Sequence, residues 1–200
     1  MKKLVIIDYG AGNVKSVSYA LGRLGIEPIL SNDIEEIQSA DKLILPGVGQ
    51  AQFAMEQLKV KGLDELIPKL KQPLLGICLG MQLLGQFSEE GEVETLGIMD
   101  FHVKKLPSIG KVPQIGWNQI YDLKGALFQG IVEREYAYYL NSYYVPLNEY
   151  NIATTNYSVA ISAAVQKDNF YGCQFHPEKS GEIGAKILQN FIENENYTCN

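Results

Sequence analysis

Apolar and polar positions in the first half of the chain follow the pattern of a parallel α/β protein. Short apolar runs, which predict buried strands, alternate with segments whose apolar residues recur at helical spacing. The predicted strands cover residues 4–7, 28–30, 42–45 and 74–77. The predicted helices cover residues 13–24, 34–38, 50–59 and 79–87. This order of elements indicates an open, mostly parallel sheet flanked by helices.

The pattern changes near residue 96. Beyond it, short alternating runs rich in Tyr, Val and Ile are separated by turn residues, which predicts additional antiparallel strands. These strands cover residues 136–140, 151–155 and 161–165, and an apolar strand at 171–175 and a helix at 184–193 complete the prediction. No repeat, low-complexity tract or linker divides the sequence, so we expect a single domain over residues 1–200.

Composition narrows the classes of function. The 200 residues are 46% hydrophobic, so one core can bury roughly 70% of the surface that the unfolded chain exposes. A net charge of −6 without a basic cluster argues against a nucleic-acid partner. The apolar start of the chain is cut at Asp8 without a cleavage-site pattern, and no run reaches transmembrane length. We therefore expect a cytoplasmic protein, in agreement with three cysteines that lack the spacing of a disulfide framework.

Cys78 is the most informative residue of the sequence. It lies between Gly76 and Gly80, where an apolar strand ends and the next helix begins. A sharp strand-to-helix turn holds one side chain clear of the sheet and points the following N–H groups toward its target. The helix N-terminus also favours the thiolate that attack requires. The alternative is a packing role, since free cysteines are commonly buried; we assign that role to Cys173 and no specific role to Cys199.

A nucleophilic thiol needs a base, and the sequence contains two histidines. His176 follows an apolar strand and is separated from Glu178 only by Pro177, which restricts the backbone around it. Glu178 can then hold one ring nitrogen of His176 while the other nitrogen faces the thiol. His102 lies in a mixed polar stretch and is expected on a surface strand. The combination predicts a Cys–His–Glu catalytic triad.

Two glycine-bearing loops compete for a role at this site. The loop at 8–13 lacks the third glycine and the Lys-Ser/Thr pair of nucleotide-binding loops, so nucleotide binding is not predicted. The loop Gly47-Val48-Gly49 ends a strand at the same sheet edge as Cys78. Its glycines let the peptide groups rotate, so its N–H groups and that of Leu79 are candidate donors to an oxyanion. A simple strand-to-helix turn is the alternative.

These motifs together resemble those of the class I, or triad, glutamine amidotransferases. The resemblance rests on the runs Gly76-Ile-Cys-Leu-Gly-Met-Gln82, His176-Pro-Glu178 and Pro46-Gly-Val-Gly49. Similarity to the glutaminase subunits of imidazole glycerol phosphate synthase extends through three further runs, residues 88–91, 111–118 and 138–143. It covers nearly the whole chain in order and implies a class I glutamine amidotransferase fold of flavodoxin-like type.

The resemblance implies hydrolysis of glutamine to glutamate and ammonia. In that reaction Cys78 attacks the amide carbon, His176 protonates the departing ammonia and later activates water, and Glu178 orients the imidazole. The similarity assigns the oxyanion to Gly47, Val48, Gly49 and Leu79, and the two ends of the glutamine zwitterion to Gln82, Glu90 and the backbone around Ser142. An ammonium group needs a carboxylate and a carboxylate needs donors, which fits these residue types. No cofactor or metal is implied.

The resemblance also implies a partner. Ammonia released to water at neutral pH becomes ammonium, which is no nucleophile, and the glutaminase motifs leave no acceptor domain within 200 residues. In the family the partner is a (β/α)8-barrel synthase that forms imidazole glycerol phosphate and aminoimidazole carboxamide ribotide. The similarity places five residues on or near the docking face: Asn13, Gln114, Trp117, Tyr138 and Lys179. Because Val48 lies between two glycines, we expect its peptide group to turn toward the site when the partner docks.

Two positions depart from the family pattern. Gln114 and Asn141 each stand where that pattern usually has histidine, and both lie near the implied interface. A second acceptor therefore stays open, a related partner that makes acetamidino groups on surface sugars. Two alternatives come from other classes. A thiol peptidase of the same fold would have no use for Gln82 and Glu90, and a non-catalytic binding subunit would require a missing triad residue.

Overall fold

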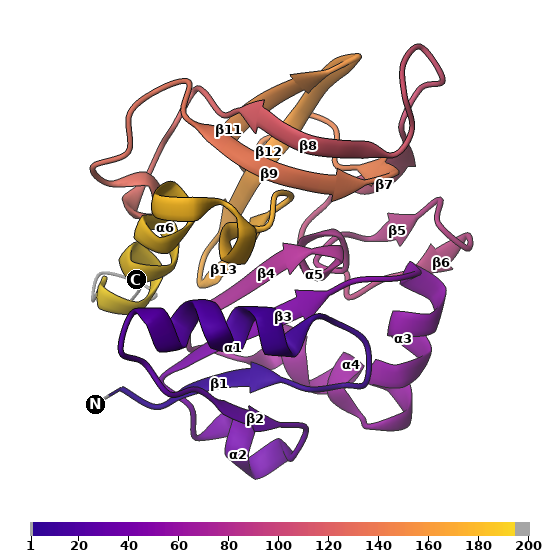
Figure 1. Cartoon of the computed structure of the whole chain (residues 1–200). Coiled ribbons are helices and arrows are strands. Elements are labelled where there is room, and N and C mark those ends of the chain that lie inside the picture. The colour runs from indigo at the N-terminus through magenta and orange to yellow at the C-terminus, as the bar shows by residue number, and fades with distance from the viewer. Residues whose placement is uncertain (1, 195–200) are drawn as a thin grey trace.

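A seven-stranded sheet forms the centre of the computed structural model, which describes residues 2–194 (Figure 1). The strand order is β11-β12-β13-β4-β3-β1-β2, and the five strands from β13 to β2 are parallel. β11 and β12 extend the sheet in antiparallel fashion. The strands are β1 (Leu4–Ile7), β2 (Ile29–Ser31), β3 (Lys42–Gly47), β4 (Leu74–Cys78), β11 (Asn151–Tyr157), β12 (Val159–Lys167) and β13 (Phe170–Cys173). The expected fold class is confirmed.

Helices cover both faces of this sheet, because its central strands are apolar on both sides. Successive side chains of β1 alternate between two apolar clusters, one against α1 and α6 and the other against α2, α3 and α4. The helices are α1 (Val14–Arg23), α2 (Ile34–Gln38), α3 (Ala51–Val60), α4 (Leu63–Leu66) and α6 (Gly181–Glu193). The short helix α4 has no counterpart in the sequence prediction, whereas the others agree with it to within a few residues.

Two smaller sheets lie beside the central one. The first has the order β10-β7-β5-β6, and the second is the antiparallel ribbon of β8 and β9. Their strands are β5 (Phe87–Ser88), β6 (Val93–Glu94), β7 (His102–Lys105), β8 (Gln114–Gln119), β9 (Tyr136–Asn141) and β10 (Tyr143–Tyr144). Three 3-10 turns complete the elements: η1 (Ile67–Lys69), η2 (Ala126–Phe128) and η3 (Pro177–Lys179). His102 is exposed and Cys173 is buried, as predicted, and Cys199 lies outside the described residues.

One predicted helix is wrong in length. The pattern predicts a helix over 79–87, but α5 covers only Leu79–Gln82, and Phe87 already belongs to β5. The helix does not continue because the backbone that follows pairs with another segment: the Gln86 N–H donates to the Phe101 carbonyl at 2.9 Å. A Cβ on Gly85 would lie 2.5 Å from the Phe101 ring, which shows how closely the two segments approach. The apolar spacing reflects burial in this segment rather than helical periodicity.

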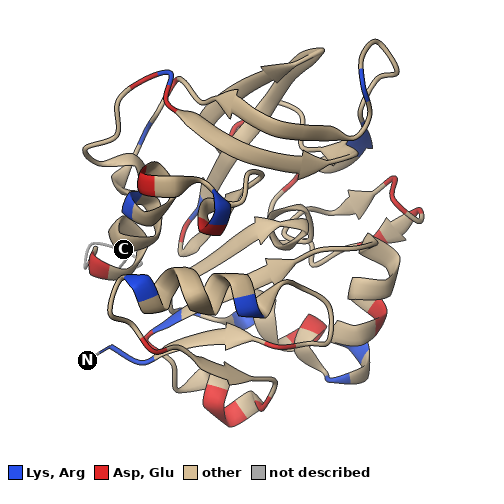
Figure 2. Ribbon diagram, viewed as in Figure 1, with Lys and Arg blue, Asp and Glu red and all other residues tan. Residues whose placement is uncertain are grey.

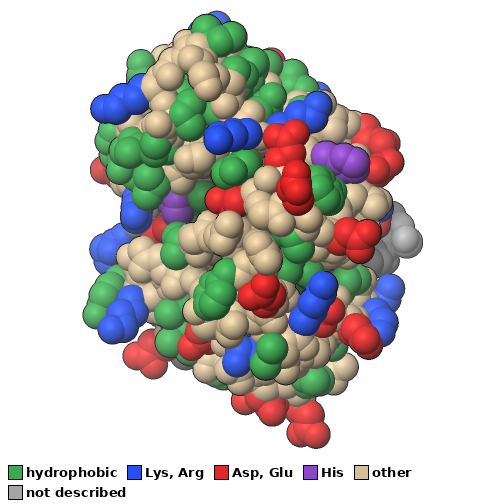
Figure 3. Space-filling model, turned by 90° about the vertical axis from the view of Figure 1, so that its right-hand side faces the viewer, with side chains coloured by type: hydrophobic (Ala, Val, Ile, Leu, Met, Phe, Trp, Pro, Cys, Tyr) green, Lys and Arg blue, Asp and Glu red, His purple; other side chains and the backbone are tan. Residues whose placement is uncertain are grey.

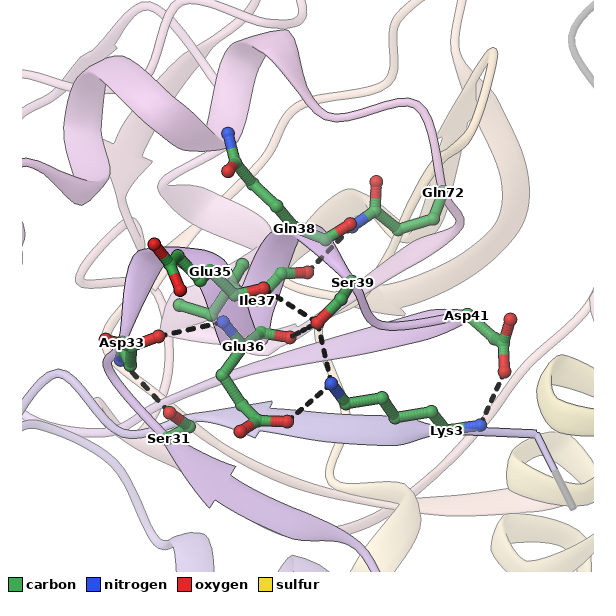
Figure 4. A network of polar contacts seen from close by, with 10 residues as sticks. All are labelled: Lys3, Ser31, Asp33, Glu35, Glu36, Ile37, Gln38, Ser39, Asp41 and Gln72. Carbon is green, nitrogen blue, oxygen red and sulfur yellow. Dashed lines mark hydrogen bonds and ion pairs between the residues drawn. The ribbon is translucent and has the colours of Figure 1, made fainter.

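A polar network joins the amino ends of β1 and β3 to α2 (Figure 4). The Lys3 N–H donates to Asp41 at 2.6 Å, and the Lys3 ammonium contacts Ser39 at 2.6 Å and Glu36 at 2.5 Å. The Asp33 carboxylate caps α2 by accepting from the Glu36 N–H at 2.9 Å. These contacts position the end of the parallel sheet that lies opposite Cys78.

Charged side chains of both signs are spread over most of the molecule, whereas β8 and β9 carry none (Figure 2). The ribbon is therefore a stretch of surface without charged side chains of its own. Within residues 2–194, every helix is too short or too polar to span a lipid bilayer.

Candidate active site

Cys78 ends β4 at a sharp turn into α5, as the sequence predicts. Its backbone has φ 54° and ψ −108°, a conformation that non-glycine residues rarely adopt and that is found at strained functional positions. The Cys78 sulfur lies 3.7 Å from the Leu140 carbonyl oxygen, and Gln174 Nε2 donates to it at 3.6 Å. The turn thus brings the sulfur between β9 and the segment that follows β13.

Glycines allow this turn to pack closely on the neighbouring strand. A Cβ atom on Gly80 would lie 1.9 Å from the Leu45 carbonyl oxygen, and one on Gly47 would lie 2.4 Å from the Gly80 nitrogen. No side chain fits at these distances. The start of α5 therefore lies directly against the end of β3, where Gly47 is the ladder partner of Cys78.

His176 and Glu178 reach the same sheet edge from β13. That strand is parallel to β4, so the carboxyl ends of the two strands lie side by side. His176 Nδ1 and Glu178 Oε1 are 2.9 Å apart, and both side chains are buried. The His176 N–H donates to the Tyr138 carbonyl of β9 at 2.8 Å, which holds the turn in place. Nε2 has no hydrogen-bond partner within residues 2–194, so this nitrogen is left for the thiol and a substrate.

The electrostatic environment favours a charged imidazole. Burial lowers the pKa of His176, but hydrogen bonding and charge interaction with Cys78 and Glu178 outweigh it and raise the pKa to about 10. A protonated ring can donate its proton to a departing amine. Because the folded-state pKa lies above the ordinary value of 6.5, His176 stabilises the fold fully below about pH 6.5 and loses this contribution as the pH rises through about 10.

We expect the His176 ring to remain protonated well above neutral pH, because hydrogen bonding and charge interaction with Cys78 and Glu178 stabilise its positive charge. NMR titration of ring-labelled histidine should show a midpoint near 10, in the signal that is absent from His176→Asn. Glu178→Gln should lower this midpoint by removing a negative partner. A wild-type midpoint near or below about pH 7 would contradict the arrangement.

A cavity of about 230 Å³ opens over the thiol. It is smaller than the roughly 300–1,000 Å³ that drug-sized ligands occupy, so it suits a molecule of amino-acid size. Its walls bring together residues that the sequence analysis expects at the site: Val48, Gly49, Cys78, Leu79, Gln82, Glu90, Ser142 and His176. The structure adds Pro113, Leu140, Asn141 and Tyr143.

The loop after β3 borders this cavity. Gly49 has φ +98°, in the left-handed region that favours glycine. The buried Tyr9 hydroxyl donates to the Pro46 carbonyl at 2.9 Å and anchors the start of the loop. Gly47 does not line the cavity itself but sets the position of the loop against the turn. Leu79 opens α5, so its N–H lies in the first turn, where an α-helix offers no acceptor.

Gln82 and Glu90 lie on the cavity wall with different hydrogen-bond partners. Gln82 Nε2 donates to the Tyr143 carbonyl at 3.0 Å and to Gln174 Oε1 at 2.9 Å. Glu90 Oε2 accepts from the Ala51 N–H at the start of α3 at 3.0 Å. Burial raises the pKa of Glu90, and the hydrogen bond from Ala51 opposes this rise.

The residues expected at the docking face lie in three places. Trp117 and Tyr138 are cross-strand partners on the outer face of the β8–β9 ribbon, with ring centroids 5.9 Å apart, and Lys179 Nζ lies 5.8 Å from the Tyr138 ring centre. Gln114 points to the inner face, where it is buried and its amide has no hydrogen-bond partner within the described range. Asn13 caps the start of α1.

Sequence reasoning missed three residues around the sulfur. Leu140 and Tyr143 contribute main-chain carbonyls, which leave no trace in residue type. Gln174 did leave a signal: it precedes His176 by two positions at the end of an apolar strand. Residues two apart in an extended segment lie on the same side, so this spacing could have placed its amide beside the imidazole.

Comparison with known proteins agrees with this geometry. The model of the family described as glutamine amidotransferase class-I matches residues 5–194. The imidazole glycerol phosphate synthase subunit HisH from Bacteroides fragilis (strain YCH46) is 52% identical over 194 residues, covering 96% of this chain and 99% of that protein. The HisH subunit from Escherichia coli (strain K12) is 52% identical over 193 residues, covering 95% and 98% respectively.

A solved structure of PurLQS from Thermotoga maritima has a similar fold, with a TM-score of 0.73 over 96% of this chain and 98% of that chain. Its sequence identity of 20% supports the fold alone. The family model and the two HisH relatives agree with the geometry of the cysteine turn and the His–Glu pair. The chain belongs to the class-I glutamine amidotransferases and, within them, to the HisH subunits of imidazole glycerol phosphate synthase.

Proposed function

We propose that this chain hydrolyses the side-chain amide of glutamine, with Cys78 as nucleophile, His176 as acid and base, and Glu178 as the orienting carboxylate. One observation carries the proposal: a cysteine in a strained turn and His176 border one cavity of amino-acid size, and Glu178 lies 2.9 Å behind the His176 ring. A nucleophile, a base and an orienting group in this relation are the parts of a catalytic triad.

The reaction proceeds in two stages. Because the His176 ring already carries its proton, the Cys78 sulfur attacks as the thiolate: it bonds to the amide carbon, and the carbonyl oxygen becomes negative. The N–H groups of Leu79 and of the loop Gly47-Val48-Gly49 receive this charge; losing one such donor typically costs about 3 kcal/mol of transition-state stabilisation. The C–N bond then breaks as His176 Nε2 protonates the departing nitrogen, which releases ammonia and leaves a thioester and a neutral imidazole. Water, deprotonated by His176, attacks the thioester and breaks the C–S bond to release glutamate.

The contacts of Gln82 determine which end of glutamine it binds. Both hydrogens of its amide are donated to protein acceptors, so only Oε1 remains for a ligand. That oxygen and the Glu90 carboxylate can accept hydrogen bonds from the ammonium group. The backbone around Ser142 is left to bind the α-carboxylate.

The outer face of the β8–β9 ribbon is the proposed docking surface for a (β/α)8-barrel synthase, with Asn13, Gln114 and Lys179 near it. Exposed hydrophobic side chains gather there: Ile115, Trp117, Tyr136 and Leu140. Figure 3 shows hydrophobic side chains collected over the upper part of the molecule, where Figure 1 places the ribbon. Large aromatic residues on a charge-free surface are typical of interface cores.

Docking on β9 would act directly on the catalytic groups. The Tyr138 carbonyl accepts from the His176 N–H, and the Leu140 carbonyl lies 3.7 Å from the Cys78 sulfur. Ammonia released from the cavity can then pass to the synthase without meeting bulk water. The two HisH relatives support imidazole glycerol phosphate synthase, and with it histidine biosynthesis, over the surface-sugar acceptor.

The test is reconstitution with the synthase from the same cell. Glutamate and imidazole glycerol phosphate should form together from glutamine and the phosphorylated ribosyl acceptor. Supplying ammonium salt instead of glutamine measures the synthase alone. Cleavage of peptides with no release of glutamate would favour the thiol peptidase and refute the proposal.

Trp117→Ala is expected to weaken binding to the synthase about 30-fold, because exposed Trp anchors at interface centres contribute about 2 kcal/mol or more. Isothermal titration calorimetry measures this dissociation constant. Val60→Ala on α3 is the control, since it truncates an exposed apolar side chain away from the ribbon. Equal affinities for the two variants would place the interface elsewhere.

Docking should also raise the rate of glutamine hydrolysis. The peptide groups beside Val48 can rotate between two glycines, so the oxyanion donor is expected to turn inward when the synthase binds. Steady-state release of glutamate, measured with and without the synthase, checks this. Equal rates would remove the gating role of the loop.

A further inference from the structure

Gln174 is a fully buried amide beside the proposed nucleophile. It lies between β13 and His176, and its Nε2 is 3.6 Å from the Cys78 sulfur. Its own N–H donates to the Ala163 carbonyl at 2.8 Å, so its backbone is held by the sheet. It has no part in the proposed reaction, yet within residues 2–194 it is the side chain that donates to that sulfur.

The orientation of the Gln174 amide follows from its neighbours. The Tyr143 carbonyl can only accept, so the Gln82 group that contacts it at 3.0 Å must be the NH₂. The same NH₂ contacts the Gln174 amide at 2.9 Å, so the facing atom of Gln174 must be the oxygen. The NH₂ of Gln174 is therefore the group that faces Cys78. The Tyr143 carbonyl thus orients the Gln82 amide, which in turn orients the Gln174 amide with its NH₂ toward the Cys78 sulfur.

The protonation state of the sulfur decides how much this donor matters. A thiol can donate to the Leu140 carbonyl at 3.7 Å, but a thiolate can only accept. When the proton moves from Cys78 to His176 Nε2, the contact with Leu140 loses its hydrogen bond and the contact with Gln174 becomes charge-assisted. A donor to the charged form stabilises that form.

We propose that Gln174 is a positioning residue which donates a hydrogen bond to the Cys78 thiolate and holds the sulfur in line for attack, with Gln82 and the Tyr143 carbonyl fixing the direction of its amide. The proposal rests on the proposed function, because it gives Cys78 the role of nucleophile. It also gives Gln82 a second role besides substrate binding.

The test measures how the alkylation rate of Cys78 by iodoacetamide depends on pH, in the full-length chain. Mass spectrometry of peptides separates Cys78 from the other cysteines. Gln174→Met keeps the length of the side chain and removes the donor, so the pH of half-maximal alkylation should rise by about one unit or more. Gln174→Glu keeps the shape and adds a negative charge, so the rise should be larger. Gln82→Met should move the midpoint in the same direction by freeing the Gln174 amide.

Other titratable groups near the sulfur are left unchanged by these variants. They are His176 and Glu178 after β13, Cys173 on β13, Tyr9 after β1 and Glu90 on the cavity wall. Asn169→Leu is the matched control: this buried amide donates to the carbonyls of Leu70 and Gln72 at 3.0 Å, away from the cavity. It should lower the melting temperature without moving the alkylation midpoint.

The outcomes separate this proposal from the proposed function. An unchanged midpoint in a folded Gln174→Met or Gln174→Glu variant overturns the positioning role, whatever happens to glutamine turnover. Glutamate release that survives Cys78→Ala overturns the proposed function, while a shifted midpoint would still show that Gln174 stabilises the thiolate.

Discussion

Cys78→Ala is expected to lower glutamate release by the assembled complex on the order of 10⁴-fold or more, the scale of loss when a covalent nucleophile is removed. An alanine methyl group cannot form the thioester, so only the cavity and the oxyanion donors remain to accelerate hydrolysis. Glutamate dehydrogenase coupled to the reaction measures the rate. Affinity for the synthase should be unchanged, because Cys78 is buried beneath the ribbon's outer face.

Cys173→Ala provides the control for this prediction. Its thiol is fully buried on β13 and does not line the cavity, so its loss should cost packing but leave turnover within a few-fold of wild type. A diazo-ketone analogue of glutamine should label Cys78 in the wild type and in Cys173→Ala. If Cys78→Ala retains its turnover, or the label attaches to another residue, the nucleophile has been misassigned.

The meeting of the proposed catalytic residues could be expected from the sequence because its determinants are largely local. Cys78 lies between two glycines at a strand end, and His176 lies one proline away from Glu178. The rule that parallel strands present their carboxyl ends at one edge then joins the two motifs, and β4 and β13 are indeed neighbours. The pairing of β4 with β13 itself came from the structure.

The remaining features depend on contacts that sequence patterns do not record. The register of β8 against β9 decides that Trp117 and Tyr138 share the outer face while Gln114 faces inward. The length of α5 depends on the hydrogen bond between Gln86 and the Phe101 segment. The direction of the Gln174 amide depends on the distant Tyr143 carbonyl, which acts through the amide of Gln82. Each is a tertiary effect.

Gly80→Ala should show how tightly the catalytic turn is packed. The new Cβ would lie 1.9 Å from the Leu45 carbonyl oxygen of β3, which is main chain in the middle of the sheet and has no flexible end to move aside. Overpacking of this kind costs about 3 kcal/mol of the free energy of unfolding. For a chain of 200 residues, the melting temperature should fall by roughly 6–12 °C, as followed by circular dichroism.

The same substitution should also reduce glutamine turnover in the fraction that remains folded. α5 can relieve the clash only by moving away from β3, and this movement displaces Cys78 and the Leu79 N–H from His176 and the oxyanion loop. Gly22→Ala is the control, because nothing lies within 4 Å of its Cβ position near the end of α1. Alanine there should stabilise the fold by about 0.5–1 kcal/mol and leave turnover unchanged. If the two variants melted at the same temperature, the close packing of α5 on β3 would not contribute to the free energy of unfolding. Other contacts would then have to hold the strained turn.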